Sequence, residues 1–240
     1  MIEEKQKILN SLRKEILLLE GFKEPMLCEE TRLGCINDAF PNKVFPFSAL
    51  HEFFCFNPEE VAASSAFITG LLSSRISKVA TVVWIGSSLK VFPPSLKWFG
   101  IEPHCVVFLQ VKKEKDISWA IQEALSCSSL SAVVGEMPEM SITASRRFQL
   151  AIENAGVGCF ILRKNPKNLL TTAVTRWHIQ PLPTKKETGL PGIGHPRWKV
   201  DLLKVRNGKT GSWNIEWTAS GFRYPSRFAV MGNSLYKQIG

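Results

Sequence analysis

The sequence predicts an α/β domain with a mixed central sheet flanked by helices, parallel in its first half and antiparallel in its C-terminal strands. Between Leu50 and Arg163, short apolar runs alternate with amphipathic segments. This pattern is typical of buried parallel strands whose two faces are covered by helices. After Pro166, polar and apolar residues alternate one by one, which is typical of antiparallel strands with one buried face. An apolar fraction of 45% in 240 residues suffices for one sizeable core.

Residues 1–21 are predicted to form an amphipathic helix that ends at Gly21. Its apolar stripe is formed by Ile8, Leu12, Ile16 and Leu19. This stripe could bind a partner protein or a second copy, or it could pack against its own domain, and the residues alone favour neither. Residues 22–47 have no hydrophobic period and contain three prolines, so they are predicted to be an irregular connection.

Residues 48–220 are predicted to form the core domain, and residues 221–240 a mobile tail. A helix is expected to begin at Pro58, because proline suits the first helical turn and Glu59 and Glu60 complement the helix dipole. Further helices are expected at Pro94–Phe99, Lys115–Ser126 and Ile142–Ala155. Strands are expected at Leu50–Phe56, Lys78–Gly86, Cys105–Val111, Ser131–Gly135, Gly158–Arg163, Thr172–Pro181, Pro196–Arg206 and Ser212–Ala219.

The net charge of +9 and the isoelectric point of about 9.3 suggest a nucleic acid or an acidic partner. The excess of basic residues is concentrated after Arg163. The six cysteines form no C-x-x-C pair and the four histidines are scattered, so we expect reduced thiols, no metal site and no cofactor. The N-terminus lacks the pattern of a signal peptide, and no apolar run is long enough for a membrane span. We therefore expect a cytoplasmic protein.

The turn between the first core strand and its helix resembles a degenerate phosphate-binding loop of the RecA type. Pro58 and Glu59 match the RecA loop G-P-E-S-S-G-K-T, and Ser64 takes the place of its Mg²⁺ ligand. The two glycines are replaced by Asn57 and Ala62, and the lysine by Ala63.

Two later strands resemble RecA strands that end in catalytic acids. Ser88 aligns with the catalytic glutamate, and Gly135 aligns with the Walker B aspartate, with Glu136 one step displaced. The resemblance thus implies that the lysine, the glutamate and the aspartate of ATP hydrolysis are all absent, so that no group neutralises the triphosphate or orients water. We therefore expect no enzymatic activity.

Several longer sequence segments are similar to those of the ImuA family of SOS-mutagenesis proteins, over roughly residues 34–218. They are ALHEFF at 49–54, GEMPEM at 135–140, TASRRFQLAIENAG at 143–156, TRWHIQP at 175–181 and PRWKVDLLKVRNG at 196–208. The resemblance implies a RecA-like core without recombinase activity that serves error-prone translesion synthesis. The partners it implies are the Y-family-like protein ImuB, a DnaE-type error-prone polymerase and RecA.

Single-stranded DNA is the alternative partner, because aromatic side chains interleaved with cations can stack bases and bind phosphates. The two DNA-binding loops of RecA both correspond to short segments here, and the second keeps Arg163, Lys164 and Lys167. The pairs Arg176-Trp177 and Arg197-Trp198, followed by Lys199, lie on strands that should be neighbours. The simpler interpretation is that the Trp rings pack in the sheet while the Arg stems cover it, and a third is that both pairs anchor a protein interface.

Overall fold

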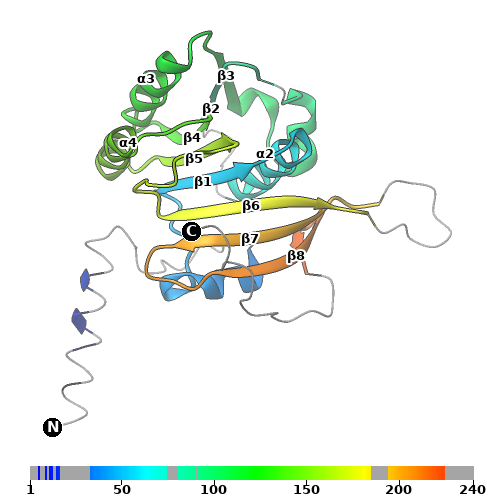
Figure 1. Cartoon of the computed structure of the whole chain (residues 1–240). Coiled ribbons are helices and arrows are strands. Elements are labelled where there is room, and N and C mark those ends of the chain that lie inside the picture. Colours follow the sequence, from blue (N-terminus) through cyan, green and yellow to red (C-terminus); the bar gives the residue numbers. More distant parts are fainter. Residues whose placement is uncertain are drawn as a thin grey trace.

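The central sheet of the protein has nine strands in the order β3-β2-β4-β5-β1-β6-β7-β8-β9 (Figure 1). The structure, a computed structural model, describes residues 33–74, 81–89, 91–184 and 194–224. It also describes six helical residues near the N-terminus, namely Lys5, Leu9, Ser11, Leu12, Glu15 and Ile16. The mixed sheet and its flanking helices confirm the fold class predicted from the sequence.

The first five strands are parallel, and all but the partly exposed edge strand β3 are largely buried, as their continuous apolar runs predict. They are β1 (Leu50–Cys55), β2 (Thr81–Gly86), β3 (Val106–Gln110), β4 (Leu130–Glu136) and β5 (Gly158–Lys164). The next strand, β6 (Thr175–Leu182), pairs parallel with β1 and antiparallel with β7 (Arg197–Val205). The change of direction therefore lies between β6 and β7, which corrects the expectation that β6 belongs to an antiparallel half.

The sheet continues with β8 (Gly211–Thr218) and the short strand β9 (Gly221–Arg223), both antiparallel to their neighbours. Asn207 adopts a positive φ of 57° in the Asn-Gly turn between β7 and β8, as such hairpin turns require. The tail that the sequence predicts from Gly221 onward thus begins with a strand, and residues 225–240 lie outside the described part of the chain.

Helices cover both faces of the sheet, and strand alternation assigns a separate core to each face. Helix α2 (Pro58–Ser73) packs with Trp84 and Phe160 on one face. On the other face, α3 (Glu114–Leu125) and α4 (Ile142–Ala155) pack with side chains such as Ile85 and Ile161. Because neighbouring residues of a strand point to opposite faces, a single residue step decides which core a side chain joins.

Residues 33–47 contribute to the α2 side of the core. They form two 3₁₀ helices, η1 (Gly34–Ala39) and η2 (Pro41–Lys43), and they bury Leu33, Ile36, Phe40 and Phe45. The hydroxyl of Tyr224 donates a hydrogen bond to the carbonyl of Leu33, so the two ends of the described core are joined. Two further 3₁₀ helices, η3 (Pro93–Phe99) and η4 (Pro103–Cys105), connect β2 to β3.

Candidate functional site

The turn from β1 to α2 is where the sequence predicts a degenerate phosphate-binding loop, and two of its amides are bound by its own side chains. The carboxamide Oδ1 of Asn57 accepts a hydrogen bond from the amide of Glu60 at 2.8 Å. In return, Oε2 of Glu60 accepts one from the amide of Phe56 at 2.7 Å, in the manner of a capping box. Nε2 of His178 lies 3.1 Å from the same carboxylate oxygen. The turn therefore presents a carboxylate where a phosphate would need free amides.

The residues that align with the lysine and the Mg²⁺ ligand of a phosphate-binding loop point into the core. Ala63 is 5% exposed and belongs to the apolar cluster on the α2 face. Ser64 is fully buried, and its hydroxyl accepts a hydrogen bond from the thiol of Cys55 at 3.5 Å. Ser64 is therefore packed, and it cannot reach a bound cation without unfolding the first turns of α2.

A cavity of about 570 Å³ opens beside this turn, between α2 and η3. Its lining is mainly apolar and includes Phe56, Val61, Val91, Phe92, Leu96 and Phe99. Its charged groups are Glu136 and Lys164, at the ends of β4 and β5. The carboxyl edge of parallel strands is where wound sheets bind ligands, but this cavity offers mostly hydrocarbon to one.

Strand alternation places Glu136, and not Gly135, on the face of the cavity. A Cβ atom on Gly135 would lie 2.4 Å from Cδ1 of Ile121, inside the core under α3. The acidic side chain that lines the cavity is therefore Glu136, which follows the residue aligned with the Walker B aspartate. Oε1 of Glu136 accepts a hydrogen bond from Nε1 of Trp84 at 3.1 Å, and its Oε2 accepts one from Nζ of Lys164 at 2.9 Å. Both oxygens of this carboxylate are thus already bound within the protein.

Arg163 is fully buried and forms ion pairs, so the structure does not support it as a contact for DNA phosphates. Its Nη1 donates a hydrogen bond to Oε1 of Glu52 at 2.8 Å, and its Nη2 lies 3.4 Å from Oε2 of Glu139. Arg176 binds the other oxygen of Glu52 through Nε at 3.0 Å and Nη2 at 2.9 Å. Both guanidinium groups also lie over the ring of Phe54, at 5.6 and 4.8 Å.

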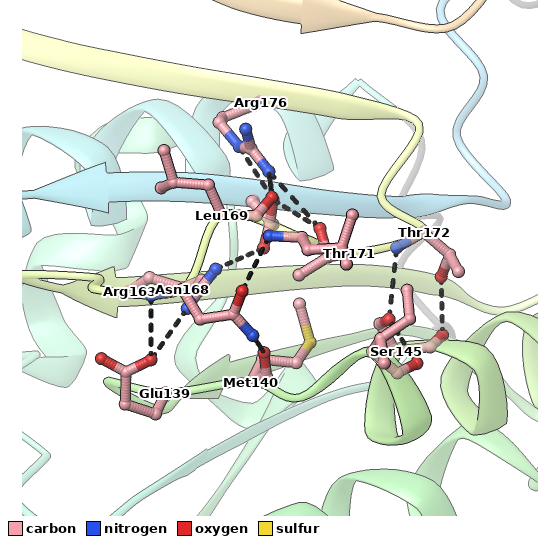
Figure 2. Close-up of polar contacts among 12 residues, drawn as sticks. Glu139, Met140, Ser145, Arg163, Asn168, Leu169, Thr171, Thr172 and Arg176 are labelled. Carbon is pink, nitrogen blue, oxygen red and sulfur yellow. Dashed lines mark hydrogen bonds and ion pairs between the residues drawn. The ribbon is translucent and has the colours of Figure 1, made fainter. Parts of the chain in front are cut away.

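The two segments that the sequence predicts to correspond to the DNA-binding loops of RecA are hydrogen-bonded to each other. They are the residues after β4 and the β5–β6 connection (residues 165–174). Oε1 of Glu139 accepts a hydrogen bond from the amide of Lys167 at 3.0 Å. Nδ2 of Asn168 donates to the carbonyl of Met140 at 3.4 Å (Figure 2). The hydrogen bond from the backbone amide of Lys167 lowers the pKa of Glu139 from its ordinary value, in spite of some desolvation, and the backbone amide of Asn168 and the charge of Arg163 lower it further. Neither segment is a loose loop.

The stacking role considered for the two Trp residues is wrong, because neither ring is accessible to a base. Trp177 is 0% exposed and stacks on Phe53 with ring centroids 6.2 Å apart. Trp198 is 3% exposed and packs against Phe67 and Phe99. The simpler interpretation, in which the rings pack in the sheet, is the one that the structure bears out.

The remaining DNA-binding candidates are scattered, and most have acidic partners. Nε of Arg197 lies 3.0 Å from Oε1 of Glu216, and Nζ of Lys199 lies 3.2 Å from Oδ2 of Asp201. Lys164 binds Glu136, as described above, and Lys167 is exposed. The structure therefore does not bring these cations together on one surface. It does not support the site for single-stranded DNA that was expected from them.

Two acidic residues that organise this region, Glu52 and Glu139, were missed by the sequence-based prediction. Glu52 is 0% exposed in the middle of β1, and it accepts hydrogen bonds from Arg163, Arg176 and the hydroxyl of Thr171. A carboxylate inside an otherwise apolar strand is rare unless it is paired. That exception in the run ALHEFF was the available signal.

Of the partner-binding candidates near the N-terminus, the structure describes Leu12 and Ile16, both helical and about half exposed at 48% and 52%. Ile8 and Leu19 lie outside the described residues.

Within the described part of the chain, no group of three or more His, Cys, Asp or Glu side chains could hold a metal ion. Over the same residues, no helix is both long enough and apolar enough to cross a bilayer.

Comparisons with known proteins show which proteins this chain is similar to. Protein ImuA of Caulobacter vibrioides strain NA1000 is 29% identical over 212 residues, which cover 81% of this chain and 87% of that protein. Protein ImuA of Caulobacter vibrioides strain ATCC 19089 matches to the same extent. The solved structure of SulA from Pseudomonas aeruginosa is similar over 48% of this chain and 96% of its own, with 17% identity and a TM-score of 0.41. No family model matches. The similarity to the two ImuA proteins over most of both lengths supports the resemblance to the ImuA family that the sequence predicts.

Proposed function

We propose that this protein is a non-catalytic accessory protein of damage-induced, error-prone translesion synthesis, and that it acts as an adaptor to ImuB and RecA. Its relation to ImuA supports the process. The β1–α2 turn supports the absence of catalysis, since the carboxylate of Glu60 and the carboxamide of Asn57 occupy the amides that a nucleotide phosphate would need.

A triphosphate at this turn would meet a carboxylate and would lack a cation. The lysine of a phosphate-binding loop neutralises the β- and γ-phosphates, and the residue in its place is the buried Ala63. The cation that lines the cavity, Lys164, already binds Glu136 at 2.9 Å. Releasing it would leave the carboxylate of Glu136, which is 5% exposed, without its charged partner, and this is costly in a buried site.

Equilibrium binding of labelled ATP in the presence of Mg²⁺ tests the non-catalytic half of this proposal. We expect no saturable binding below millimolar concentration and no release of phosphate. A RecA protein measured alongside provides the positive control. An affinity in the micromolar range, or hydrolysis above the level of a buffer blank, would contradict the proposal.

Co-purification with ImuB and RecA from the same organism tests the adaptor half. We expect ImuB to be retained by the full-length chain, and a DnaE-type polymerase to be retained only when ImuB is present. Failure of both ImuB and RecA to bind the full-length chain would contradict the adaptor role.

The N-terminal helix is our candidate for one of these contacts, because Leu9, Leu12 and Ile16 are 49%, 48% and 52% exposed on it. Replacing Leu12 and Ile16 by Asp should then weaken binding of RecA or ImuB while leaving the melting temperature of the core unchanged. Replacing Lys5 and Glu15 by Ala, at exposed positions of the same segment, provides the matched control. Equal binding by both variants would exclude this stripe as a partner contact.

A further inference from the structure

The β5–β6 connection presents two consecutive leucines to solvent. Leu169 is 54% exposed and Leu170 is 70% exposed. Exposed apolar side chains are common one at a time, whereas adjacent pairs on a fixed backbone are typical of contact surfaces. The question is therefore whether this backbone is fixed and what surrounds the pair.

The backbone around the two leucines is held by hydrogen bonds at almost every residue. The carbonyl of Leu169 accepts a hydrogen bond from Nη2 of Arg176 at 2.6 Å (Figure 2). The amide of Leu170 donates to Oδ1 of Asn168 at 2.9 Å. On the C-terminal side, the amide of Thr172 donates to Oγ of Ser145 at 3.2 Å, and its carbonyl accepts from Nη2 of Arg206 at 2.9 Å. A partner would therefore bind a segment that is already ordered, which lowers the entropic cost of association.

Basic side chains border the leucine pair. Besides Arg176 and Arg206, Nζ of Lys204 donates to the carbonyl of Thr171 at 3.4 Å, and Lys167 is exposed. The pKa of Lys204 is lowered, mainly because burial disfavours its charged form. Repulsion from Arg176 and Arg206 lowers it further, and the attraction of Glu52 opposes the shift. The acidic groups of this region are Glu52, which is fully buried between two arginines, and Glu139, which binds two amides and Arg163. The surface around the leucines is therefore positively charged.

We propose that Leu169 and Leu170, with their border of Lys167, Arg176, Lys204 and Arg206, form the docking surface for an acidic polypeptide segment of the partner protein. That segment carries apolar side chains that cover the leucines and Asp or Glu residues that face the basic border. The charge complementarity of such a contact sets specificity and association rate, and the burial of the two leucines adds the hydrophobic contribution to affinity.

A polypeptide fits this surface better than a nucleic acid does. Bases stack on aromatic rings or on free guanidinium planes, and the guanidinium groups of Arg176 and Arg206 are bound to backbone carbonyls or to Glu52. The exposed side chains at the centre of this surface, Leu169 and Leu170, are aliphatic, and the nearest tryptophan along the chain, Trp177, is buried.

This inference rests on the proposed function, because ImuB is the partner with which it is tested. The dissociation constant for purified ImuB should rise about tenfold or more when Leu169 and Leu170 are both replaced by Asp. The control is Leu150→Asp, another leucine that is 61% exposed, on the outer side of α4, and its affinity should equal that of the unchanged chain. Equal melting temperatures of all three proteins show that the effect is one of binding. The milder pair Leu169→Ser and Leu170→Ser should weaken binding in the same direction.

The outcomes separate the inference from the function on which it rests. Binding of ImuB by the unchanged chain, with equal affinity for the double Asp variant, overturns the docking surface and leaves the adaptor role intact. Absence of ImuB binding by the unchanged chain overturns the ImuB contact of the proposed function and, with it, this inference, while the contact with RecA is tested separately. Loss of affinity for labelled single-stranded DNA in the double Asp variant, with ImuB binding unchanged, would assign the surface to nucleic acid and overturn the proposal.

Discussion

The guanidinium of Arg163 lies 2.8 Å from the carboxylate of Glu52, and both side chains are fully buried. Because Arg176 binds the other oxygen of the same carboxylate, one acidic group compensates two arginines. Replacing Glu52 by Gln keeps the shape and removes the charge, so that Arg163 loses its buried partner. The free energy of unfolding should fall by about 3–5 kcal/mol, as measured by urea denaturation.

An exposed ion pair of the same chain provides the control for this prediction. Asp38 lies 3.0 Å from Nζ of Lys43, and their side chains are 62% and 78% exposed. Asp38→Asn should cost less than about 1 kcal/mol, because water screens such pairs. Equal losses for Glu52→Gln and Asp38→Asn would show that the buried network does not stabilise the fold.

Restoring the missing lysine should fail to restore nucleotide binding. Ala63→Lys introduces a long charged side chain at a position that is 5% exposed in the core cluster, and it leaves the carboxylate of Glu60 on the turn. We expect a loss of stability on the order of 2 kcal/mol or more and no ATP binding. Ala62→Lys, at the exposed position next to it, should leave the melting temperature nearly unchanged. Saturable ATP binding by the Ala63→Lys variant would contradict this account of the turn.

The carboxamide of Asn57 caps α2, so its removal should destabilise that helix. Asn57→Ala abolishes the hydrogen bond to the amide of Glu60 and should lower the free energy of unfolding by about 1 kcal/mol. Asn57→Ser keeps an acceptor at the cap and should recover most of this loss. If the Ala and Ser variants unfold at the same denaturant concentration, the cap does not contribute.

The buried imidazole of His51 should make the stability depend on pH below neutrality. Burial lowers the pKa of His51 from 6.5 to about 4, although the carbonyls of Phe47 and Pro46 favour the charged form. The folded state thus binds the proton later than the unfolded state as the pH falls. Stability should decline between pH 6.5 and pH 4, by about 3 kcal/mol over the whole window.

Comparison with a variant isolates this histidine from the other three. Unfolding free energies measured from pH 7 to pH 5 should decline less steeply in His51→Gln than in the unchanged chain. Parallel curves for the two proteins would show that His51 does not cause the dependence.

The order and type of the core elements could be predicted from the sequence because hydrophobic periodicity is a local property. Helix α4 begins and ends at the predicted residues, and the strands from β3 to β8 begin or end within three residues of the predicted positions. The capping residues Asn57 and Ser141 and the Gly156 stop act within a few residues of themselves, so the chain alone contains the information for them. The partial burial of residues 33–47 escaped prediction, because their apolar residues have no period and fit the core only through distant contacts.

The roles of the charged residues could not be predicted in this way. Arg163 and Arg176 look like exposed basic positions in the sequence, yet the carboxylate that binds both lies 111 and 124 residues away from them. The sequence alone did not decide whether Gly135 or Glu136 faces the cavity, because the face of β4 to which each residue points is set by strand pairing.

By itself, the sequence thus determined the α/β class, the strand and helix order, the resemblance to the ImuA proteins and the lack of a lysine in the β1–α2 turn. Only the tertiary structure decided which charges are compensated, which Trp rings are buried and which apolar side chains remain exposed. The physical reason is that periodicity and capping act over a few residues, while the partner of a buried charge is set by which strands the sheet brings together. Leu169 and Leu170 show this most clearly, because nothing in their local sequence distinguishes them from core leucines, and their exposure follows from a connection fixed to α4, β6 and β7.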